Sequence, residues 1–395
     1  MVQNEKEEYT LLVPQVLDYH MPLLKYAFHS SPCNPVIMEE TDGILELGKQ
    51  YIHCDICYPA ILIAGQIIKT LQSGEYDAKH TAVLAPDFLN GCLNSAYIPI
   101  IRNALDEAGF LDVRVISLKG DKEENSLPLT ADLFLRAVAA LYYGDLLMLL
   151  TNQTEPYEKH EGLTGMLAAY WTQIVSEDLR WSGAISENDI IRRFREIVQD
   201  FARMEKTDRD VLKVGIVGEL YVKYCRLGNR DLVHYLKGQN CEYYMNGLTW
   251  YVLFSMENDL LSKNVAAADS YSALFQHFLK LQKEMVKILR EHGFYCIDAY
   301  DVFKEKAEKH VHCRCDAGDG WLIGAEFIHL ALNGYNRIIC GQPLGCLVSP
   351  VCGRGLYSAI QQQFPDVRYV SVDYDADCND NSMRNQIQML LTDCQ

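Results

Sequence analysis

The feature of this sequence that most constrains its fold is an alternation of short strand-like and longer helix-like segments, which occurs twice. The first region contains the strand-like stretches "YTLLVPQ", "TAVLAP" and "VRVISL", separated by the helical stretches "YPAILIAGQIIKTLQSGEYD" and "AYIPIIRNALDEAGF". The second region opens with "VLKVGIVGELYVKY" and continues with "FYCIDAY", "NRIICGQP" and "VRYVSVDYD", with the helical "YSALFQHFLKLQKEMVKILREHG" among them. Alternation of this kind predicts parallel sheets covered by helices on both faces.

The strand signals stop between the two regions. There, "TADLFLRAVAALYYGDLLMLLTNQ" and "SENDIIRRFREIVQDFARM" are long and amphipathic, and Ser186 and Asp189 have the spacing of a capping box. We therefore expect an α/β protein with two Rossmann-like parallel-sheet lobes, at residues 1–125 and 208–395, a helical insert at residues 126–207, and a cleft between the lobes.

Composition and charge narrow the classes of partner. Hydrophobic residues make up 49% of the 395 residues and charged residues 23%, as in a folded globular protein. The net charge of −17 argues against nucleic acid or an anionic membrane as the main partner, because both require a basic face. The N-terminal "MVQNEKEEYT" is unlike a signal peptide, and apolar stretches such as "YPAILIAGQII" are shorter than the ~20 residues that span a bilayer. We expect a soluble, cytoplasmic protein.

Fourteen cysteines are many for a cytoplasmic chain, where they indicate metal or redox chemistry more often than disulfides. Cys296 and Cys340 occur in strand-like runs and are predicted to be core residues. Cys92 and Cys346 follow strands, at the sheet edge where parallel sheets form their sites. Cys57 opens a helix, where amide dipoles lower the pKa of a thiol.

Three thiolates can bind three corners of a four-iron cluster and leave one iron free for another ligand. Spacing alone, however, favours the simpler alternative that Cys57, Cys92 and Cys346 are three unrelated buried cysteines. Cys54 and Cys57 also form a CxxC pair, which could be half of a zinc site, a thioredoxin-like redox couple or a chance occurrence. The stretch "HVHCRC" could complete it, although a solvated loop is favoured there; its candidate ligands are His310, His312, Cys313 and Cys315.

Nucleotide-binding and hydrolase motifs are missing from the sequence. It contains no GxxxxGK[ST], GxSxG or HExxH, and "GDGWLIG" does not fit GxGxxG. The glycines of "VGIVGELYVKY" predict a tight turn from strand to helix. Glu219 and Lys223 in this stretch have i,i+4 spacing, for which a structural ion pair is favoured over catalysis. Catalytic acid–base residues cannot be chosen from these patterns.

Taken together, several of these stretches resemble the 2-hydroxyacyl-CoA dehydratase family, in the branch related to the C-terminal part of acyl-CoA dehydratase activase-related proteins. The resemblance covers most of the chain except the helical insert. It differs from that branch at "PDFLNGC", where a glycine run is expected, and at Cys352. The resemblance is carried by "YTLLVPQVLDYHMPLLKYAF", "CYPAILIAGQIIKTLQSGEYD", "NGCLNSAYIPIIRNALDEAGF", "VRVISL", "VGIVGELYVKY", "GDGWLIGAEFI" and "GQPLGCLVSPVCGRG".

The resemblance implies an iron–sulfur cluster, of the four-iron four-sulfur type, bound by Cys57, Cys92 and Cys346, with sulfurs roughly 6–7 Å apart. It implies a hydro-lyase that removes water from a 2-hydroxyacyl-CoA by radical chemistry. A separate ATP-dependent activator protein would supply the low-potential electron. A homodimer, or a heterodimer with a paralogous subunit, is expected.

Two alternatives remain. The first is a reductase of small molecules that carries a larger, double-cubane cluster, which Cys54, Cys340 and Cys352 could help to bind. The second is a non-catalytic accessory subunit whose cysteines bind structural metal or nothing. The iron and sulfide content of each chain would separate these alternatives from the dehydratase.

Overall fold

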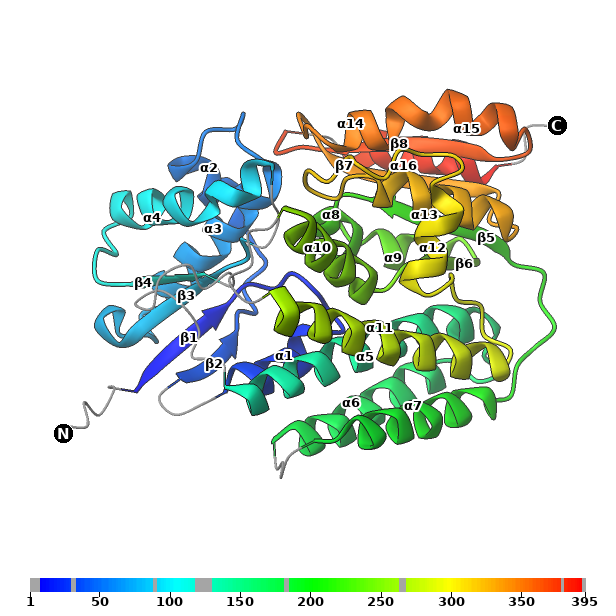
Figure 1. Ribbon diagram of the computed structural model, residues 1–395. Helices are drawn as coiled ribbons and strands as arrows, with labels where there is room; N and C mark the ends of the chain where they lie inside the picture. The colour runs from blue at the N-terminus through cyan, green and yellow to red at the C-terminus, as the bar shows by residue number, and fades with distance from the viewer. Residues whose placement is uncertain are drawn as a thin grey trace.

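The computed structural model describes residues 8–29, 33–87, 91–117, 130–180, 185–262, 268–377 and 380–392. These residues form two four-stranded sheets in which every pair of neighbouring strands is parallel, with helices packed around them (Figure 1). The predicted fold class, α/β with two parallel-sheet lobes and a helical part, is therefore confirmed.

The first lobe is built on a sheet with the strand order β2-β1-β3-β4. Its central strands are short, continuous apolar runs, and Leu11 of β1 lies opposite Ala82 of β3 with both side chains fully buried. The strands are β1 (Tyr9–Val13), β2 (Cys33–Ile37), β3 (Thr81–Ala85) and β4 (Arg114–Ser117). The helices are α1 (Met21–Phe28), α2 (Ile44–Tyr51), α3 (Tyr58–Gln72) and α4 (Tyr97–Glu107).

The second lobe has a sheet with the order β6-β5-β7-β8, which is the order of the first sheet with each strand number raised by four. Its strands are β5 (Leu212–Gly218), β6 (Cys241–Met245), β7 (Arg337–Pro343) and β8 (Arg368–Tyr374). Its helices are α8 (Leu220–Tyr224), α9 (Leu232–Gly238), α10 (Leu248–Ser262), α12 (Tyr300–Ala307), α13 (Leu322–Leu332), α14 (Ser349–Cys352), α15 (Tyr357–Gln363) and α16 (Asp380–Leu391).

A group of long helices packs beneath both lobes, as the lower part of Figure 1 shows. It consists of α5 (Ala131–Thr154), α6 (Leu163–Arg180), α7 (Glu187–Ala202) and, from the second region of the sequence, α11 (Ala268–Glu291). The predicted capping box at the start of α7 is present. The predicted boundary between residues 125 and 126 lies outside the described residues, and the one between 207 and 208 falls in the loop between α7 and β5.

Three expectations about strands were wrong. The segment "FYCIDAY" is not a strand, because its backbone bonds side chains instead of a neighbouring strand. The N–H of Tyr295 donates to the side chain of Gln153 at 2.8 Å, and the N–H of Ile297 donates to the hydroxyl of Tyr244 at 3.1 Å. The edge strands β2 and β6 were missed: β2 contains an asparagine and a proline, which edge strands tolerate, and β6 contains a glutamate.

The expectation that no apolar stretch reaches bilayer length was also wrong. Within the described residues, one helical stretch, Asp132–Tyr157, is 26 residues long with a mean hydropathy of 1.7. However, 72% of its most apolar window is buried inside the protein, and the core helix of a globular protein meets the same criteria. Length and composition alone therefore do not make α5 a membrane span.

Candidate functional site

One pocket is lined by loops from both lobes and contains all three cysteines that the sequence singled out. Cys57 precedes α3, Cys92 follows β3, and Cys346 follows β7. We call this the cysteine pocket; it encloses about 550 Å³, part of it open solvent. Its other lining residues are Asp55, Leu93, Asn94, Tyr97, Glu219, Gly318, Asp319, Pro343, Leu344, Gly345, Leu347 and Val348.

Cys57 occupies the position immediately before the first turn of α3. The hydroxyl of Tyr97, a buried residue of α4, donates a hydrogen bond to its Sγ at 3.4 Å. Burial raises the pKa of this thiol well above its usual range, and the nearby carboxylate of Glu219 raises it further. The expectation that the helix start lowers this pKa is wrong, because desolvation outweighs the helix dipole here.

Cys92 and Cys346 sit in short turns at the carboxyl ends of equivalent strands. Burial raises the pKa of the Cys92 thiol to about 11, with a contribution from the negative charge of Asp319. Burial also raises the pKa of Cys346, although hydrogen bonding to Ser349 opposes the shift; its Sγ lies 3.3 Å from the Ser349 Oγ. Without a cation, all three thiols therefore hold their protons at neutral pH. A bound metal cation would reverse this, since coordinating thiols lose their protons.

Two buried carboxyl groups, Glu219 and Asp319, share the pocket with the thiols. Burial raises the pKa of Glu219 to about 7, against hydrogen bonds from the N–H groups of Val222 and Tyr221. Burial and the charge of Glu219 raise the pKa of Asp319 well above its usual range. At neutral pH this pair therefore retains at least one proton, and Glu219 can give or take a proton close to pH 7.

A close approach of two strands places Glu219 in the pocket. Gly218 ends β5 at φ 126°, and a Cβ at this position would lie 1.9 Å from the carbonyl oxygen of Gly341 in β7. Only glycine permits this contact, after which the Glu219 N–H bonds the same carbonyl at 2.9 Å. The side chain of Glu219 then caps α8 by accepting the N–H of Val222 at 3.0 Å. The predicted tight strand-to-helix turn is confirmed.

The predicted ion pair between Glu219 and Lys223 is wrong. The Nζ of Lys223 instead binds both carboxylate oxygens of Glu326 in α13, at 2.9 and 3.0 Å, and both side chains are buried. Sequence reasoning therefore gave Glu219 a structural role and missed Asp319. The position of Glu219 directly after a strand, the rule that selected Cys92, could have found it.

The structure does not assemble the zinc site considered for the CxxC pair. Cys54 is exposed, whereas Cys315 lies with its Sγ 3.1 Å from that of Cys352. The His310 ring bonds Gln363 at 2.7 Å. Cys296 and Cys340 are buried in the core, as predicted.

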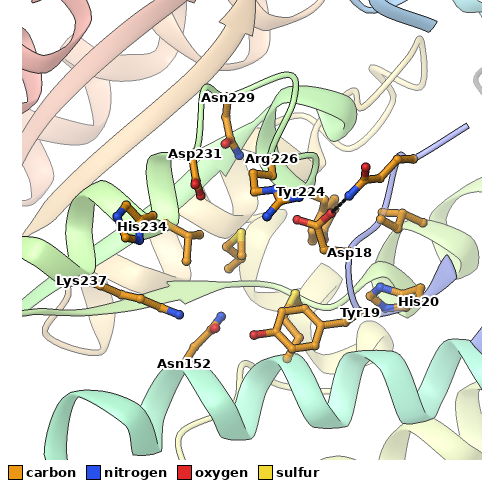
Figure 2. Close-up of a pocket in the computed structure, with 15 residues that line it drawn as sticks. Asp18, Tyr19, His20, Asn152, Tyr224, Arg226, Asn229, Asp231, His234 and Lys237 are labelled. Carbon is orange, nitrogen blue, oxygen red and sulfur yellow. Dashed lines mark hydrogen bonds between the residues drawn. The ribbon is translucent and has the colours of Figure 1, made fainter. Parts of the chain in front are cut away.

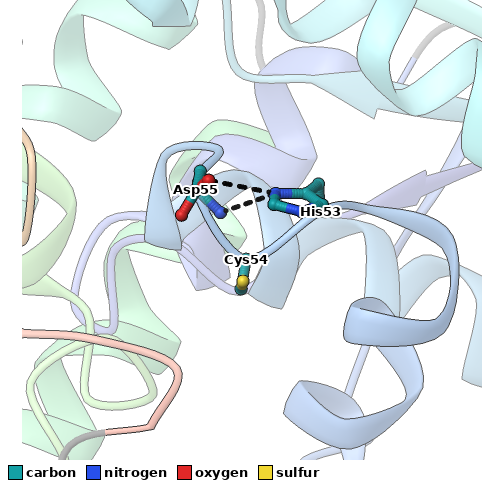
Figure 3. Close-up of side chains that lie close together, drawn as sticks. All are labelled: His53, Cys54 and Asp55. Atoms are coloured by element: carbon teal, nitrogen blue, oxygen red, sulfur yellow. Dashed lines mark hydrogen bonds and ion pairs between the residues drawn. The ribbon is translucent and has the colours of Figure 1, made fainter.

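Another group of possible metal ligands is the exposed trio His53, Cys54 and Asp55, whose ligand atoms lie within 4.8 Å of one another (Figure 3). His53 already contacts Asp55 at 3.4 Å, and such exposed groups are common without an ion. The three pocket sulfurs do not all lie this close together. The sulfurs that bind a cubane cluster lie roughly 6–7 Å apart, so a spacing beyond 4.8 Å is compatible with such a cluster.

A second pocket lies between α5, α9 and the loop after β1, and we call it the polar pocket (Figure 2). It encloses about 1050 Å³, including open solvent, and its charged groups have both signs. Figure 2 shows Asn152, Lys237 and Tyr19 pointing into the same part of it. The Asn152 amide is buried and has no hydrogen-bond partner in the described part of the chain. None of these residues was predicted from the sequence.

Comparison with known proteins assigns no family to the chain. No protein-family model matches the sequence, and a search of curated proteins finds no significant match.

Proposed function

We propose that Cys57, Cys92 and Cys346 bind a four-iron four-sulfur cluster, and that the chain is a hydro-lyase of the 2-hydroxyacyl-CoA dehydratase type. The observation that carries the proposal is the meeting of these thiols, from three segments and both lobes, in one pocket. The sequence resemblance described above supplies the reaction class.

The donor set fits such a cluster. Three thiols are soft ligands suited to iron–sulfur clusters, and three of them leave one iron open. Among the described residues that line the cysteine pocket there is no Lys, Arg or His, whereas three carboxylic acids line it: Asp55, Glu219 and Asp319. A pocket with acidic groups, thiols and no base favours a cationic occupant over an anionic one.

The bound cluster would supply a low-potential electron and a Lewis-acidic iron. The chain itself would supply protons. Glu219, with its pKa near 7, is placed to protonate a hydroxide that leaves the substrate. Tyr97 fixes the orientation of the Cys57 thiol through its 3.4 Å hydrogen bond.

The electron is proposed to come from an ATP-driven activator protein, because the sequence carries none of the phosphate-loop motifs. Such a donor must approach the pocket closely. Three leucines that line the pocket are exposed and offer an apolar contact at its rim: Leu93 by 43%, Leu344 by 57% and Leu347 by 70%.

Iron and acid-labile sulfide, counted per chain after anaerobic purification, test the cluster. About four irons support the proposal, about eight support the double-cubane reductase, and none supports a non-catalytic accessory subunit. The reaction class is tested separately, by following water loss from 2-hydroxyacyl-CoA esters with activator, ATP and a reductant. A four-iron protein that is inert with every ester would contradict the dehydratase but leave the cluster standing.

A further inference from the structure

Two cysteines outside the proposed ligand set face each other at the edge of the cysteine pocket. Cys315 lies in the loop before α13, Cys352 ends α14, and their Sγ atoms are 3.1 Å apart. A disulfide bond is about 2.05 Å long, so the sulfurs need to approach by only about 1 Å. Other described cysteines are buried without a second sulfur at this distance, including Cys33, Cys225, Cys241 and Cys296.

The backbone holds both members of the pair in place. The carbonyl of Cys315 accepts the N–H of Trp321 at 2.9 Å, and the N–H of Cys352 bonds the Val348 carbonyl at 2.8 Å. The Cys315 loop fits closely because a Cβ at Gly320 would lie 2.2 Å from the Cys315 carbonyl oxygen. The loop and the helix therefore hold the two side chains with their sulfurs in contact.

The two thiols differ in access to solvent. Cys315 is half-buried, while Cys352 is only 5% exposed. An external reagent therefore reaches Cys315 first, and Cys352 is positioned to react from the protein side. This is the arrangement of an attacking and a resolving cysteine.

We propose that Cys315 and Cys352 are a redox-active pair that forms a reversible disulfide by exchange with a low-molecular-weight disulfide such as glutathione disulfide. The Cys315 thiolate attacks one sulfur of the small disulfide, whose S–S bond breaks as a mixed disulfide forms and one small thiol leaves. The Cys352 sulfur then attacks the Cys315 sulfur as its thiol proton leaves, and the second small thiol is released. Two electrons pass from the protein thiols to the small disulfide, and the two thiol protons end on the released thiols.

A Cys315–Cys352 disulfide would link two segments of the chain that contribute lining residues to the cysteine pocket. Gly318 and Asp319, which line the pocket, follow Cys315 in the same loop, and Cys346 precedes α14. The disulfide would therefore restrain the loop that carries Asp319 against the segment that carries Cys346. The pairing of Cys315 with Cys352 does not depend on whether the pocket holds a cluster.

The test uses the purified protein. Samples are equilibrated without air in buffers in which an increasing fraction of the glutathione is present as glutathione disulfide. After acid quenching and thiol blocking, trypsin releases residues 315–337 and 338–354 as separate peptides unless they are linked. We expect most chains to show this linked pair in the most oxidised buffer, with fragmentation placing the bond at Cys352, and to lose it on return to reduced glutathione.

Matched variants complete the test. Cys315→Ser and Cys352→Ser should each abolish the linked peptide, while Cys340→Ser, on the same tryptic peptide as Cys352, should keep it. Persistent reduction of the wild-type pair in fully oxidised glutathione would overturn the proposal. So would a link from Cys315 to Cys340 or Cys346, or stable glutathione adducts on Cys315 that Cys352 does not resolve.

Discussion

The two lobes repeat one plan, and the cysteine pocket shows where they differ. In each sheet the third strand in the sequence, β3 or β7, pairs with the first, β1 or β5. This third strand is followed by a loop with a cysteine, Cys92 or Cys346. In each lobe a helix, α3 or α13, precedes that strand. Cys57 stands immediately before α3, whereas the pocket residue nearest the start of α13 is Asp319, three residues before Leu322.

This comparison explains the composition of the site. Two similar lobes facing each other would supply four equivalent positions, and three of them are thiols. The carboxyl group at the fourth position leaves a proposed cluster one thiol short, which is the condition for an open iron. The difference between the lobes, more than their similarity, is what would give the pocket reactivity.

The central strands differ as well. β5 leads directly to Glu219 in the cysteine pocket, whereas the loop after β1 lines the polar pocket with Gln15 and Asp18. In each lobe, the segment after the first strand is bound by a polar side chain of the helix that precedes the third strand. Gln66 of α3 accepts the N–H of Gln15 at 3.0 Å, and Glu326 of α13 binds Lys223 of α8.

The largest effect, on the amount of bound iron, is expected from removing any one of the three pocket thiols, whichever lobe it belongs to. Cys57→Ser, Cys92→Ser and Cys346→Ser should each remove most of the bound iron, because a hydroxyl is a poor ligand for a cluster. Iron and sulfide content per chain measures this. Cys296→Ser, a buried cysteine outside the pocket, should keep full iron content. Equal iron in all four variants would show that the pocket thiols hold no cluster.

A second prediction compares the stability that the Lys223–Glu326 ion pair gives the second lobe with the stability that the Gln66 hydrogen bonds give the first. Lys223→Met should lower the free energy of unfolding by about 3–5 kcal/mol, because Glu326 would be left buried without its cation. Gln66→Leu should cost less, about 1–3 kcal/mol, because it leaves only neutral groups unpaired. Urea denaturation of both variants measures the difference. A Gln66 variant as unstable as the Lys223 variant would mean that charge is not what separates the two lobes here.

The third prediction concerns the pH dependence of the second lobe in metal-free protein. The pKa of Glu219 rises from 4.5 to about 7 on folding, so its contribution to stability is full below about pH 4.5 and is lost as the pH rises through about 7. The loss amounts to roughly 3 kcal/mol. Glu219→Gln keeps an acceptor for the Val222 N–H and should flatten this decline. Denaturation at pH 5 and pH 8 tests it; the same decline in both proteins would contradict the assignment.

The sequence predicted some strands and some site residues of the two lobes and missed others. The strands β1 and β3 are apolar runs between turn signals, and Cys92 and Cys346 followed from their position at strand ends. The edge strands β2 ("CNPVI") and β6 ("CEYYM") contain polar residues or proline that interrupt an apolar run, and "FYCIDAY" has a strand-like composition whose bonding partners lie far away in the sequence. Glu219 directly follows β5 and could have been selected by the same rule, whereas Asp319 could not, because its raised pKa comes from burial between segments that only the folded chain brings together.

The smallest effect, and the most direct test of the comparison, comes from making the lobes alike at the fourth position. Asp319→Cys would place a fourth thiol just before α13, where the first lobe has Cys57 before α3. We expect the variant to bind as much iron as the wild type and to lose it in air about tenfold more slowly, a difference of about 1.4 kcal/mol in the barrier, because the open iron gains a ligand. Dehydration activity should fall for the same reason.

Asp319→Asn, which changes charge without adding a ligand, should leave the rate of iron loss near that of the wild type. If the cysteine and asparagine variants lose iron at the same rate, the fourth position does not face the open iron, and the correspondence between the start of α3 and the start of α13 is one of fold alone.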